Sequence, residues 1–398
     1  PEYSGTVRYV LDASKSVPVA SALINKEAAE DLHIDTKAKY QKLREEHDFH
    51  EIRVENPLMV FANEVAPIKE VKDAVNKALW QSCDAGQKEF AAHLFDDELR
   101  AHAWCKSHYS KKRYAEVNEK ETVTQSGQPY LHVPEKHKKT GVLLVHGFLA
   151  SPAELKDLGD KYAAEGFPVM GVRLAGHGTS PWDLHYRKWQ DWLESVRRGY
   201  QILSAYCDEI VVVGFSAGGV LSLILASEKP EKLAGVASVC APLTVHDRHL
   251  GFVPIVHNLN KLVSWIPSIE GVVQFHESKS GQPDVNYCSM PIHALNEFRR
   301  MMRALRRHLQ DIDTHVTLIQ ADGDPVVIPS SADDIYDGLK NADKTIHWIE
   351  SKQHGIIYND VGETHKLLID FANARNEAVA QKTKPAATKR LEKRAEEE

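Results

Sequence analysis

The sequence predicts an α/β protein in which helices flank a mostly parallel sheet, with an extra, mainly helical segment before it. After Lys139, short apolar runs alternate with helical segments, a pattern typical of a parallel sheet covered on both faces. Before about residue 120, the chain is instead rich in helix-forming and charged residues. The 398 residues, 42% hydrophobic and 26% charged, suffice for two globular domains. This composition excludes collagen-like, coiled-coil and wholly disordered proteins.

Residues 1–120 form the first predicted region. Apolar residues recur at three- and four-residue spacings in 28–49 and 68–115, as on one face of a helix. An alternating apolar pattern gives residues 5–24 a more strand-like character. We therefore predict a mainly helical segment, and a docking or oligomerisation module is one hypothesis for its role.

The α/β region is predicted from residue 121 to residue 376. Its first strand, Gly141–Val145, is a continuous apolar run, as expected for a strand buried on both faces. Ser151 is a suitable N-cap for the next helix, and Gly166 ends that helix. The other strands are expected at 167–172, 210–213, 233–240, 316–319 and 345–348. Helices are expected at 151–164, 186–207 and 217–227.

The alternation of strands and helices breaks between Ala241 and Asp313. A long insertion after a sheet strand is where a lid or binding loop lies, so we predict a lid at about 241–313. Its helical run, Pro291–Asp311, has a basic face, which we interpret as the solvated side of an amphipathic helix. The alternative is a lid helix that meets lipid surfaces or anionic substrates. The basic residues are Arg299, Arg300, Arg303, Arg306 and Arg307.

The C-terminal residues 377–398 are almost free of apolar side chains. They contain mainly Lys, Arg, Glu and Ala, which cannot bury enough apolar surface to fold alone. We predict a charged, disordered tail, with a frayed helix as the alternative.

The strongest functional signal is the stretch Gly214–Gly218, with the letters GFSAG. It follows the apolar run 210–213 and opens a helix, which is the strand–turn–helix context of a nucleophile elbow. Such a turn raises the Ser216 hydroxyl above the sheet edge. It also directs the Ala217 N–H, at a helix N-terminus, toward the place where an oxyanion forms. The alternative, a chance Gly/Ser turn, is disfavoured by this context.

The tripeptide His146-Gly147-Phe148 directly follows the first strand. A backbone N–H at this place is the usual second donor of an oxyanion hole, so we predict that Phe148 supplies it. Alone, the tripeptide would indicate a strand-end turn with a core histidine. Beside the elbow, the functional interpretation is favoured.

A serine hydroxyl is a poor nucleophile without a general base. The base should be a histidine on a loop after the last strand, and 21 histidines compete for this role. His354, just beyond strand 345–348, has the right position. His347 lies inside that strand, as a packed or surface residue. His365 lies on the closing helix, where a solvated position is favoured.

The carboxylate that orients the base should follow the preceding strand, 316–319. Asp322 and Asp324 compete in the stretch ADGDPVV. Asp324 is favoured because the Pro-Val-Val after it would turn the chain back over the sheet edge. Asp322 is then a turn-forming residue. The resulting order, Ser216, Asp324, His354, differs from that of chymotrypsin and subtilisin and is the order of α/β-hydrolases.

A resemblance to a known family rests on the stretches VLLVHGFLASPAEL, GVRLAGHGTSPWDL, KWQDWLESV, VVVGFSAGG, QADGDPVV, the region 287–313 and the loop at His354. Together they make residues 121–374 similar to the α/β-hydrolase superfamily, and more narrowly to its carboxylesterase and monoacylglycerol-lipase branch. The resemblance implies an α/β-hydrolase fold with a lid. It also implies a triad and an oxyanion hole at the residues chosen above: Ser216, Asp324, His354, Phe148 and Ala217.

Two features depart from the family pattern. Ala217 stands where many relatives have a larger residue such as methionine, but the donor is its backbone N–H, so the chemistry should survive. The resemblance does not cover residues 1–120.

These residues predict a serine carboxylic-ester hydrolase that acts on short- to medium-chain esters or monoacylglycerols through an acyl-enzyme. Ser216 would attack the acyl carbonyl, His354 would carry the proton, and Asp324 would orient His354. The insertion would supply an apolar acyl pocket. The same triad serves acyltransferases, thioesterases and serine peptidases. A catalytically silent binding protein of the same fold is a further alternative.

Composition limits the partners. The net charge of −7 gives no global basic footprint for nucleic acid. Five widely spaced cysteines without a CxxC do not form a disulfide scaffold and favour a reducing compartment. No apolar run approaches the roughly 18–20 residues of a membrane span, and no signal peptide pattern is visible. We expect a cytoplasmic protein with a small-molecule ester substrate, and a homo-oligomer through residues 1–120 is one option.

No cofactor or metal is expected. The spacing of His102, Cys105 and His108 matches no common zinc pattern, and HExxH is absent.

Overall fold

The computed structural model describes residues 87–244, 275–277 and 281–378 of the chain. The chain divides into two compact units, residues 1–108 and residues 109–398. In the first unit, helix α8 (Gln87–His108) lies within the helical region expected at 68–115. No described helix has the combination of length and hydropathy that crossing a membrane requires. Three predicted features lie outside the described residues: the helix at 28–49, the strand-like stretch at 5–24 and nearly all of the tail.

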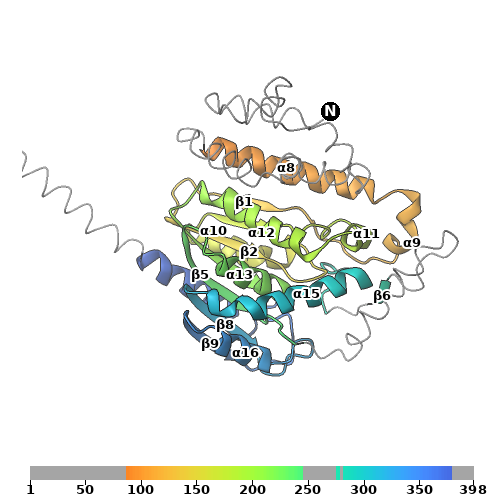
Figure 1. Cartoon of the computed structure of the whole chain (residues 1–398). Helices are drawn as coiled ribbons and strands as arrows, with labels where there is room; N and C mark the ends of the chain where they lie inside the picture. The colour runs from red at the N-terminus through yellow and green to blue at the C-terminus, as the bar shows by residue number, and fades with distance from the viewer. Residues whose placement is uncertain (1–86, 245–274, 278–280, 379–398) are drawn as a thin grey trace, which may run out of the picture. The chain divides into compact units, whose positions relative to one another are not determined.

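One sheet of seven strands organises the described part of the second unit (Figure 1). Its order is β1-β3-β2-β4-β5-β8-β9, and every neighbouring pair is parallel except β1 with β3. The predicted mostly parallel α/β sheet is therefore confirmed. The short edge strand β1 was not expected, because three half-exposed residues give little periodic signal. The strands are β1 (Tyr130–His132), β2 (Thr140–Val145), β3 (Val169–Val172), β4 (Glu209–Phe215), β5 (Leu233–Val239), β8 (His315–Ala321) and β9 (Asp343–Ile349).

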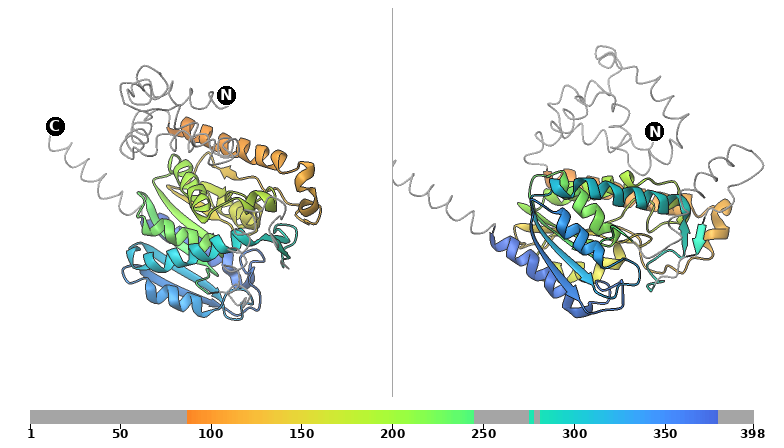
Figure 2. Two further views of the ribbon diagram at one scale, coloured as in Figure 1. Left: turned by 45° about the vertical axis from the view of Figure 1, so that its right-hand side comes forward. Right: turned by 60° about the horizontal axis from the view of Figure 1, so that its bottom comes forward.

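Helices cover both faces of this sheet (Figure 2). On one face, α10 (Lys156–Ala164) and the helix 364–378 share a buried core with strand residues such as Val142 and Val213. On the other face, α12 (Trp189–Ser204) packs against β2 and β3, and α13 (Ala217–Ser227) packs against β4 and β5. The close approach of α12 depends on Gly199, where a Cβ would lie 2.1 Å from Val172 Cγ1.

Two helix starts differ from expectation. The helix expected from Ser151 begins as the 3-10 turn η2 (Pro152–Leu155) before α10. Ser151 stands at the N-cap position, as expected, but its buried hydroxyl makes no capping hydrogen bond and has no partner among the described residues. The helix expected at 186–207 is α12, which begins three residues later at Trp189, and the short helix α11 (Pro181–His185) before it was not expected. They are separate because Lys188 is extended, with φ −102° and ψ 159°.

The described part of the insertion contains a two-stranded antiparallel ribbon and one long helix. The ribbon joins β6 (Phe275–Glu277) to β7 (Ser289–Pro291), and α15 (Ile292–His308) with η4 (Leu309–Asp311) matches the helical run expected at 291–311. Because residues 245–274 lie outside the described part, the lid and its acyl pocket stay predictions.

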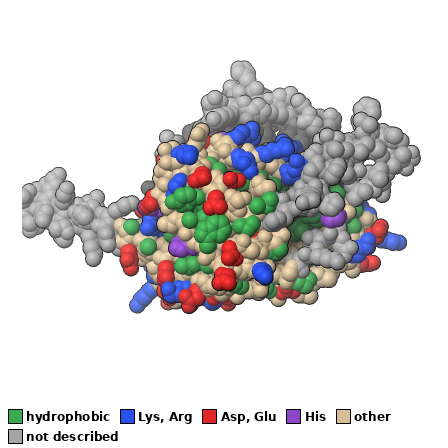
Figure 3. All heavy atoms as spheres, turned by 90° about the horizontal axis from the view of Figure 1, so that it is seen from below, with side chains coloured by type: hydrophobic (Ala, Val, Ile, Leu, Met, Phe, Trp, Pro, Cys, Tyr) green, Lys and Arg blue, Asp and Glu red, His purple; other side chains and the backbone are tan. Residues whose placement is uncertain are grey.

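Helix α15 is amphipathic, as expected. Its apolar side, which includes Phe298 and Met301, is buried, whereas most of its arginines are exposed. One view of the surface mixes hydrophobic, acidic and basic side chains, with Lys and Arg gathered along its upper edge (Figure 3). The exposure of most α15 arginines, rather than this view, is what agrees with the solvated interpretation of the basic face.

The chain just before the sheet is bonded to the insertion. The Glu121 carboxylate accepts the N–H groups of Cys288 at 2.8 Å and Ser289 at 2.9 Å. The Thr122 hydroxyl donates to the Pro283 carbonyl at 2.7 Å. These bonds connect the first residues of the predicted α/β domain to the described end of the insertion. The remaining described elements are α16 (Ser330–Gly338), η1 (Lys112–Tyr114), α9 (Ala115–Asn118) and η5 (Val361–Glu363).

Candidate active site

Ser216 occupies the sharp turn between β4 and α13. Its φ of 53° and ψ of −116° are a backbone conformation that non-glycine residues rarely adopt. Its N–H donates to the Val239 carbonyl at 2.8 Å, which fixes the turn to the neighbouring strand. A Cβ at Gly214 would lie 2.2 Å from the Gly218 oxygen, and one at Gly218 would lie 2.0 Å from the Val145 oxygen. Both positions therefore require glycine.

Ser216, His354 and Asp324 form one hydrogen-bonded chain. The Ser216 hydroxyl lies 3.0 Å from His354 Nε2, and His354 Nδ1 lies 2.7 Å from Asp324 Oδ2. A carboxylate at Nδ1 keeps the proton of a neutral ring on that nitrogen, so Nε2 is free to accept from the serine. The three residues come from the ends of β4, β8 and β9, where parallel strands meet at one sheet edge.

Backbone donors hold the Asp324 carboxylate in place. Its Oδ1 accepts the N–H groups of Val326 at 2.8 Å and Val327 at 2.9 Å. Burial acts to raise the pKa of Asp324, but the hydrogen bond and charge of His354, together with these N–H groups, lower it below its ordinary value. Asp322 instead accepts the Ser351 N–H at 3.0 Å, as a turn residue would. Of the two competing aspartates, Asp324 lies beside the histidine.

The backbone N–H groups of Phe148 and Ala217 are free to bind a ligand. Within the described residues, neither N–H donates to another protein group. Ala217 is the first residue of α13, where the helix dipole favours negative charge. The Phe148 ring stacks on Phe298 of α15, with 5.0 Å between the ring centroids. This contact joins the loop after β2 to the described end of the insertion.

His146 supports the same loop from the core. Its Nδ1 donates to the Gly147 carbonyl at 2.9 Å, and its Nε2 accepts the Leu174 N–H at 3.2 Å. Burial, and then the charge of His177, keeps the pKa of His146 well below its ordinary value. The ring is therefore neutral, as a group that both donates and accepts must be. His146 is a core histidine that also orients the loop.

Sequence reasoning missed Glu154. This residue of η2 is 5% exposed, and its Oε2 accepts the Gly147 N–H at 2.7 Å. The available signal was an acidic residue in the turn after His146-Gly147-Phe148. That signal was weak, because an acidic residue in a first helical turn is common on exposed surfaces.

The solvated position expected for His365 was wrong. Its side chain is buried, with Nε2 bonded to the Ile357 carbonyl and Nδ1 lying 2.8 Å from Lys161 Nζ. The closing helix presents this residue to the sheet side, between α10 and the loop before it. His347 lies on the last strand, as expected.

One group of side chains among the described residues has a metal-like arrangement. The potential ligand atoms of Cys240, Asp324 and His354 all lie within 4.8 Å of one another. This group overlaps the hydrogen-bonded chain, in which Asp324 and His354 already bind each other. The buried His102 and Cys105 of α8 belong to no such group in the described part of the chain.

A serine hydroxyl, a histidine, a buried carboxylate and two free N–H groups at one sheet edge can carry out nucleophilic acyl transfer. Comparison with known families agrees with this chemistry. Residues 136–361, more than half of the chain, match the family described as "Serine aminopeptidase, S33". The chain belongs to this family.

Two characterised relatives are similar over most of their own length. A thermostable monoacylglycerol lipase of Bacillus sp. (strain H-257) is 29% identical over 238 residues, which are 60% of this chain and 90% of that protein. A carboxylesterase of Bacillus subtilis (strain 168) is 27% identical over 219 residues, which are 54% and 84% of the two chains.

Solved structures share the fold. A structure from the metagenome-derived lipolytic enzymes LipS and LipT has a TM-score of 0.54 at 24% identity, covering 64% of this chain and 99% of that one. A monoacylglycerol lipase of Paleococcus ferrophilus has a TM-score of 0.51 at 18% identity, covering 62% and 99%. The predicted relationship to the carboxylesterase and monoacylglycerol-lipase branch of the α/β-hydrolases is confirmed.

Proposed function

We propose that this member of the S33 family is a serine carboxylic-ester hydrolase. The observation that carries the proposal is the hydrogen-bonded chain Ser216–His354–Asp324, set beside the free N–H groups of Phe148 and Ala217. The names of the two bacterial relatives, a monoacylglycerol lipase and a carboxylesterase, support ester hydrolysis.

In the proposed reaction, Ser216 attacks the acyl carbonyl while His354 takes the hydroxyl proton. Asp324 stabilises the imidazolium that forms, and it stays ionised because its pKa is lowered. The N–H groups of Phe148 and Ala217 bind the developing oxyanion, and one such donor typically contributes about 2.7–4 kcal/mol. His354 then gives the proton to the departing alcohol. Water, activated by the same histidine, releases the acid from the acyl-enzyme.

We propose short- to medium-chain acyl esters or monoacylglycerols as substrates. The relative named a monoacylglycerol lipase supports this class. Peptide hydrolysis is the second candidate, because the family description is that of an aminopeptidase and the same groups cleave amides.

A series of p-nitrophenyl esters, from acetate to palmitate, tests the proposal alongside aminoacyl p-nitroanilides. We expect ester turnover by the wild type, an optimum within the short and medium chains, and loss of turnover in Ser216→Ala. Ser227→Ala, at the far end of α13, is the matched control and should keep its activity. Turnover of the anilides alone would replace the esterase proposal with a peptidase. Ester turnover that survives in Ser216→Ala would contradict the serine mechanism.

A further inference from the structure

Glu154 is a buried carboxyl group with an unusual set of partners. Its Oε2 accepts the Gly147 N–H at 2.7 Å, and within the described residues it has no ion pair and no other hydrogen-bond partner. Burying a carboxyl group without a cation is costly, and an apolar side chain of similar size would avoid that cost. A group whose burial destabilises the fold, placed beside an active site, is a candidate for a functional role.

The bond to Glu154 acts on the residue just before the proposed oxyanion donor. The Gly147 carbonyl and the Phe148 N–H belong to one planar peptide unit, so fixing Gly147 fixes the direction of that N–H. Gly147 has no Cβ and rotates more freely than other residues. It is restrained at both ends: Glu154 holds its N–H, and His146 Nδ1 holds its carbonyl at 2.9 Å. Leu149, which follows Phe148, has a φ of 68°, so the loop is also strained.

We propose that Glu154 is a positioning residue for the oxyanion hole, holding Gly147 so that the Phe148 N–H points at the substrate oxygen in the transition state. The inference rests on the proposed function of the site. Glu154 does not touch the reacting atoms, and it acts through the Gly147 peptide. Its loss should therefore weaken transition-state binding more than ground-state binding.

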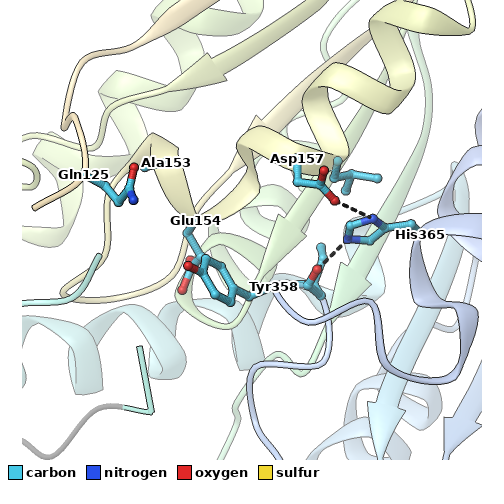
Figure 4. Close-up of a pocket in the computed structure, with 8 residues that line it drawn as sticks. Gln125, Ala153, Glu154, Asp157, Tyr358 and His365 are labelled. Carbon is cyan, nitrogen blue, oxygen red and sulfur yellow. Dashed lines mark hydrogen bonds and ion pairs between the residues drawn. The ribbon is translucent and has the colours of Figure 1, made fainter. Parts of the chain in front are cut away.

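A cavity lined by Glu154 explains how the fold accommodates this buried acid. This cavity of about 330 Å³ is lined by Glu154 and by polar residues that include Gln125, Asp157, Tyr358 and His365 (Figure 4). Of the lining residues, Tyr358 donates to Asp284 at 3.0 Å and His365 is bonded to the Ile357 carbonyl, so neither of these bonds is made to Glu154. Water in the cavity can bind the carboxyl oxygen that Gly147 leaves free.

The protonation state of Glu154 decides which variant is conservative. Burial raises the pKa of Glu154 to about 8, although the Gly147 N–H lowers it. The side chain is therefore mostly neutral at neutral pH, and its carbonyl oxygen accepts the Gly147 N–H. Glutamine has the same shape and keeps an acceptor there, leucine has no acceptor, and aspartate is one methylene too short to keep the bond.

The test compares Glu154→Gln, Glu154→Leu and Glu154→Asp in the full chain, with p-nitrophenyl butyrate as substrate. Glu154→Leu and Glu154→Asp should lower kcat by about tenfold or more and leave KM within about twofold. Removing one oxyanion-hole donor lowers kcat by about 10²–10³-fold, and a donor that points in the wrong direction loses part of that factor. Glu154→Gln should keep kcat within about threefold. Glu165→Leu, a half-exposed acid at the end of α10, is the control and should match the wild type.

A second readout separates positioning from general structure. A trifluoromethyl ketone forms a hemiketal oxyanion in the site, so its affinity should fall in Glu154→Leu in proportion to kcat/KM. Equal kcat in Glu154→Leu, Glu154→Asp and wild type would overturn the inference, as would a Glu154→Gln enzyme as slow as the leucine variant. If Glu154→Leu does not fold, the aspartate and glutamine variants decide. Lack of ester turnover by the wild type would instead be a failure of the proposed function.

Discussion

Two buried carboxyl groups, Asp324 and Glu154, support the candidate active site, and their partners differ. Asp324 is 2% exposed and Glu154 is 5% exposed, and both accept backbone N–H groups. Asp324 also faces His354 at 2.7 Å, whereas Glu154 has no basic partner among the described residues. Burial acts to raise both pKa values, but the pKa of Asp324 is lowered and that of Glu154 is raised to about 8. Burial alone does not decide whether a carboxyl group is charged, because the groups that hydrogen-bond to it also shift its pKa.

The largest effect is expected when the charge of Asp324 is removed. Asp324→Asn keeps the size of the side chain but favours the wrong tautomer of His354, so kcat should fall by about 10⁴-fold. Asp322→Asn is the matched control two residues away, and it should change kcat by less than about threefold because Asp322 only holds a turn. Steady-state ester hydrolysis measures both. A larger loss in Asp322→Asn would reverse the assignment of the two aspartates.

The next effect concerns the elbow that holds Ser216 between β4 and α13. Gly218→Ala would put a Cβ 2.0 Å from the Val145 oxygen, a backbone atom that cannot move aside cheaply. We expect a loss of more than about 3 kcal/mol in the free energy of unfolding, and with it the activity. Gly281→Ala, where a Cβ meets nothing within 4 Å, is the control. Urea unfolding that shows the same stability for both variants would mean that the close approach is not real.

A smaller effect tests the protonation of Glu154 through stability. Between about pH 4.5 and pH 8, the folded chain keeps a proton on Glu154 that the unfolded chain has released, so folding weakens as the pH rises. The loss is at most about 1.4 kcal/mol per pH unit. Glutamine does not titrate, so the stability of Glu154→Gln relative to wild type should grow from about pH 5 to pH 8.

The lowered pKa of Asp324 predicts the opposite dependence of folding stability on pH. Its pKa is lowered in the folded chain, so the stability that it contributes is present above its ordinary pKa and lost as the pH falls through the folded value.

The prediction for Glu154 is measured by urea unfolding of Glu154→Gln and wild type at several pH values. A constant difference between them across the range would show that Glu154 has an ordinary pKa.

The smallest effect concerns the aromatic contact behind the oxyanion loop. Phe298→Leu removes the stacking on Phe148 but keeps an apolar side chain. We expect a two- to threefold loss in kcat, which corresponds to the lower end, about 0.5 kcal/mol, of the free energy of an aromatic pair. Met301→Leu, a buried position on the same helix, is the control and should have no such effect on kcat. Equal values for the two variants would mean that the loop is positioned without this ring.

The parts of the molecule that the sequence predicts best have a local signal. Gly141–Val145 is a continuous apolar run, and the elbow at Ser216 combines a strand, two glycines and a helix in a few residues. The start of α12 at Trp189 rather than at residue 186 was not visible, because it depends on the extended backbone of Lys188 rather than on a proline or glycine. The burial of His365 depends on which side of the closing helix meets the sheet, and a short amphipathic pattern leaves that open.

The two carboxyl groups show the same limit within the site. Asp324 was predicted because an acid is expected after the strand that precedes the histidine, and because the Pro-Val-Val after it would turn the chain back over the sheet edge. Glu154 was missed because its importance comes from a backbone contact with Gly147, and nothing in the residue types requires that contact. Side chains that act on a ligand leave motifs in a sequence, whereas side chains that position a peptide group leave few.

The most direct test of the central claim is a pre-steady-state assay with p-nitrophenyl acetate, followed by acid quench and peptide mass spectrometry. We predict a burst of p-nitrophenol close to one equivalent per active site, and an acetyl group on the peptide that contains Ser216. The burst should be absent in Ser216→Ala and at least about 10³-fold slower in His354→Ala, which lacks the base. If the wild type hydrolyses the ester and the acetyl group is on another residue, the assignment of Ser216 as nucleophile is contradicted.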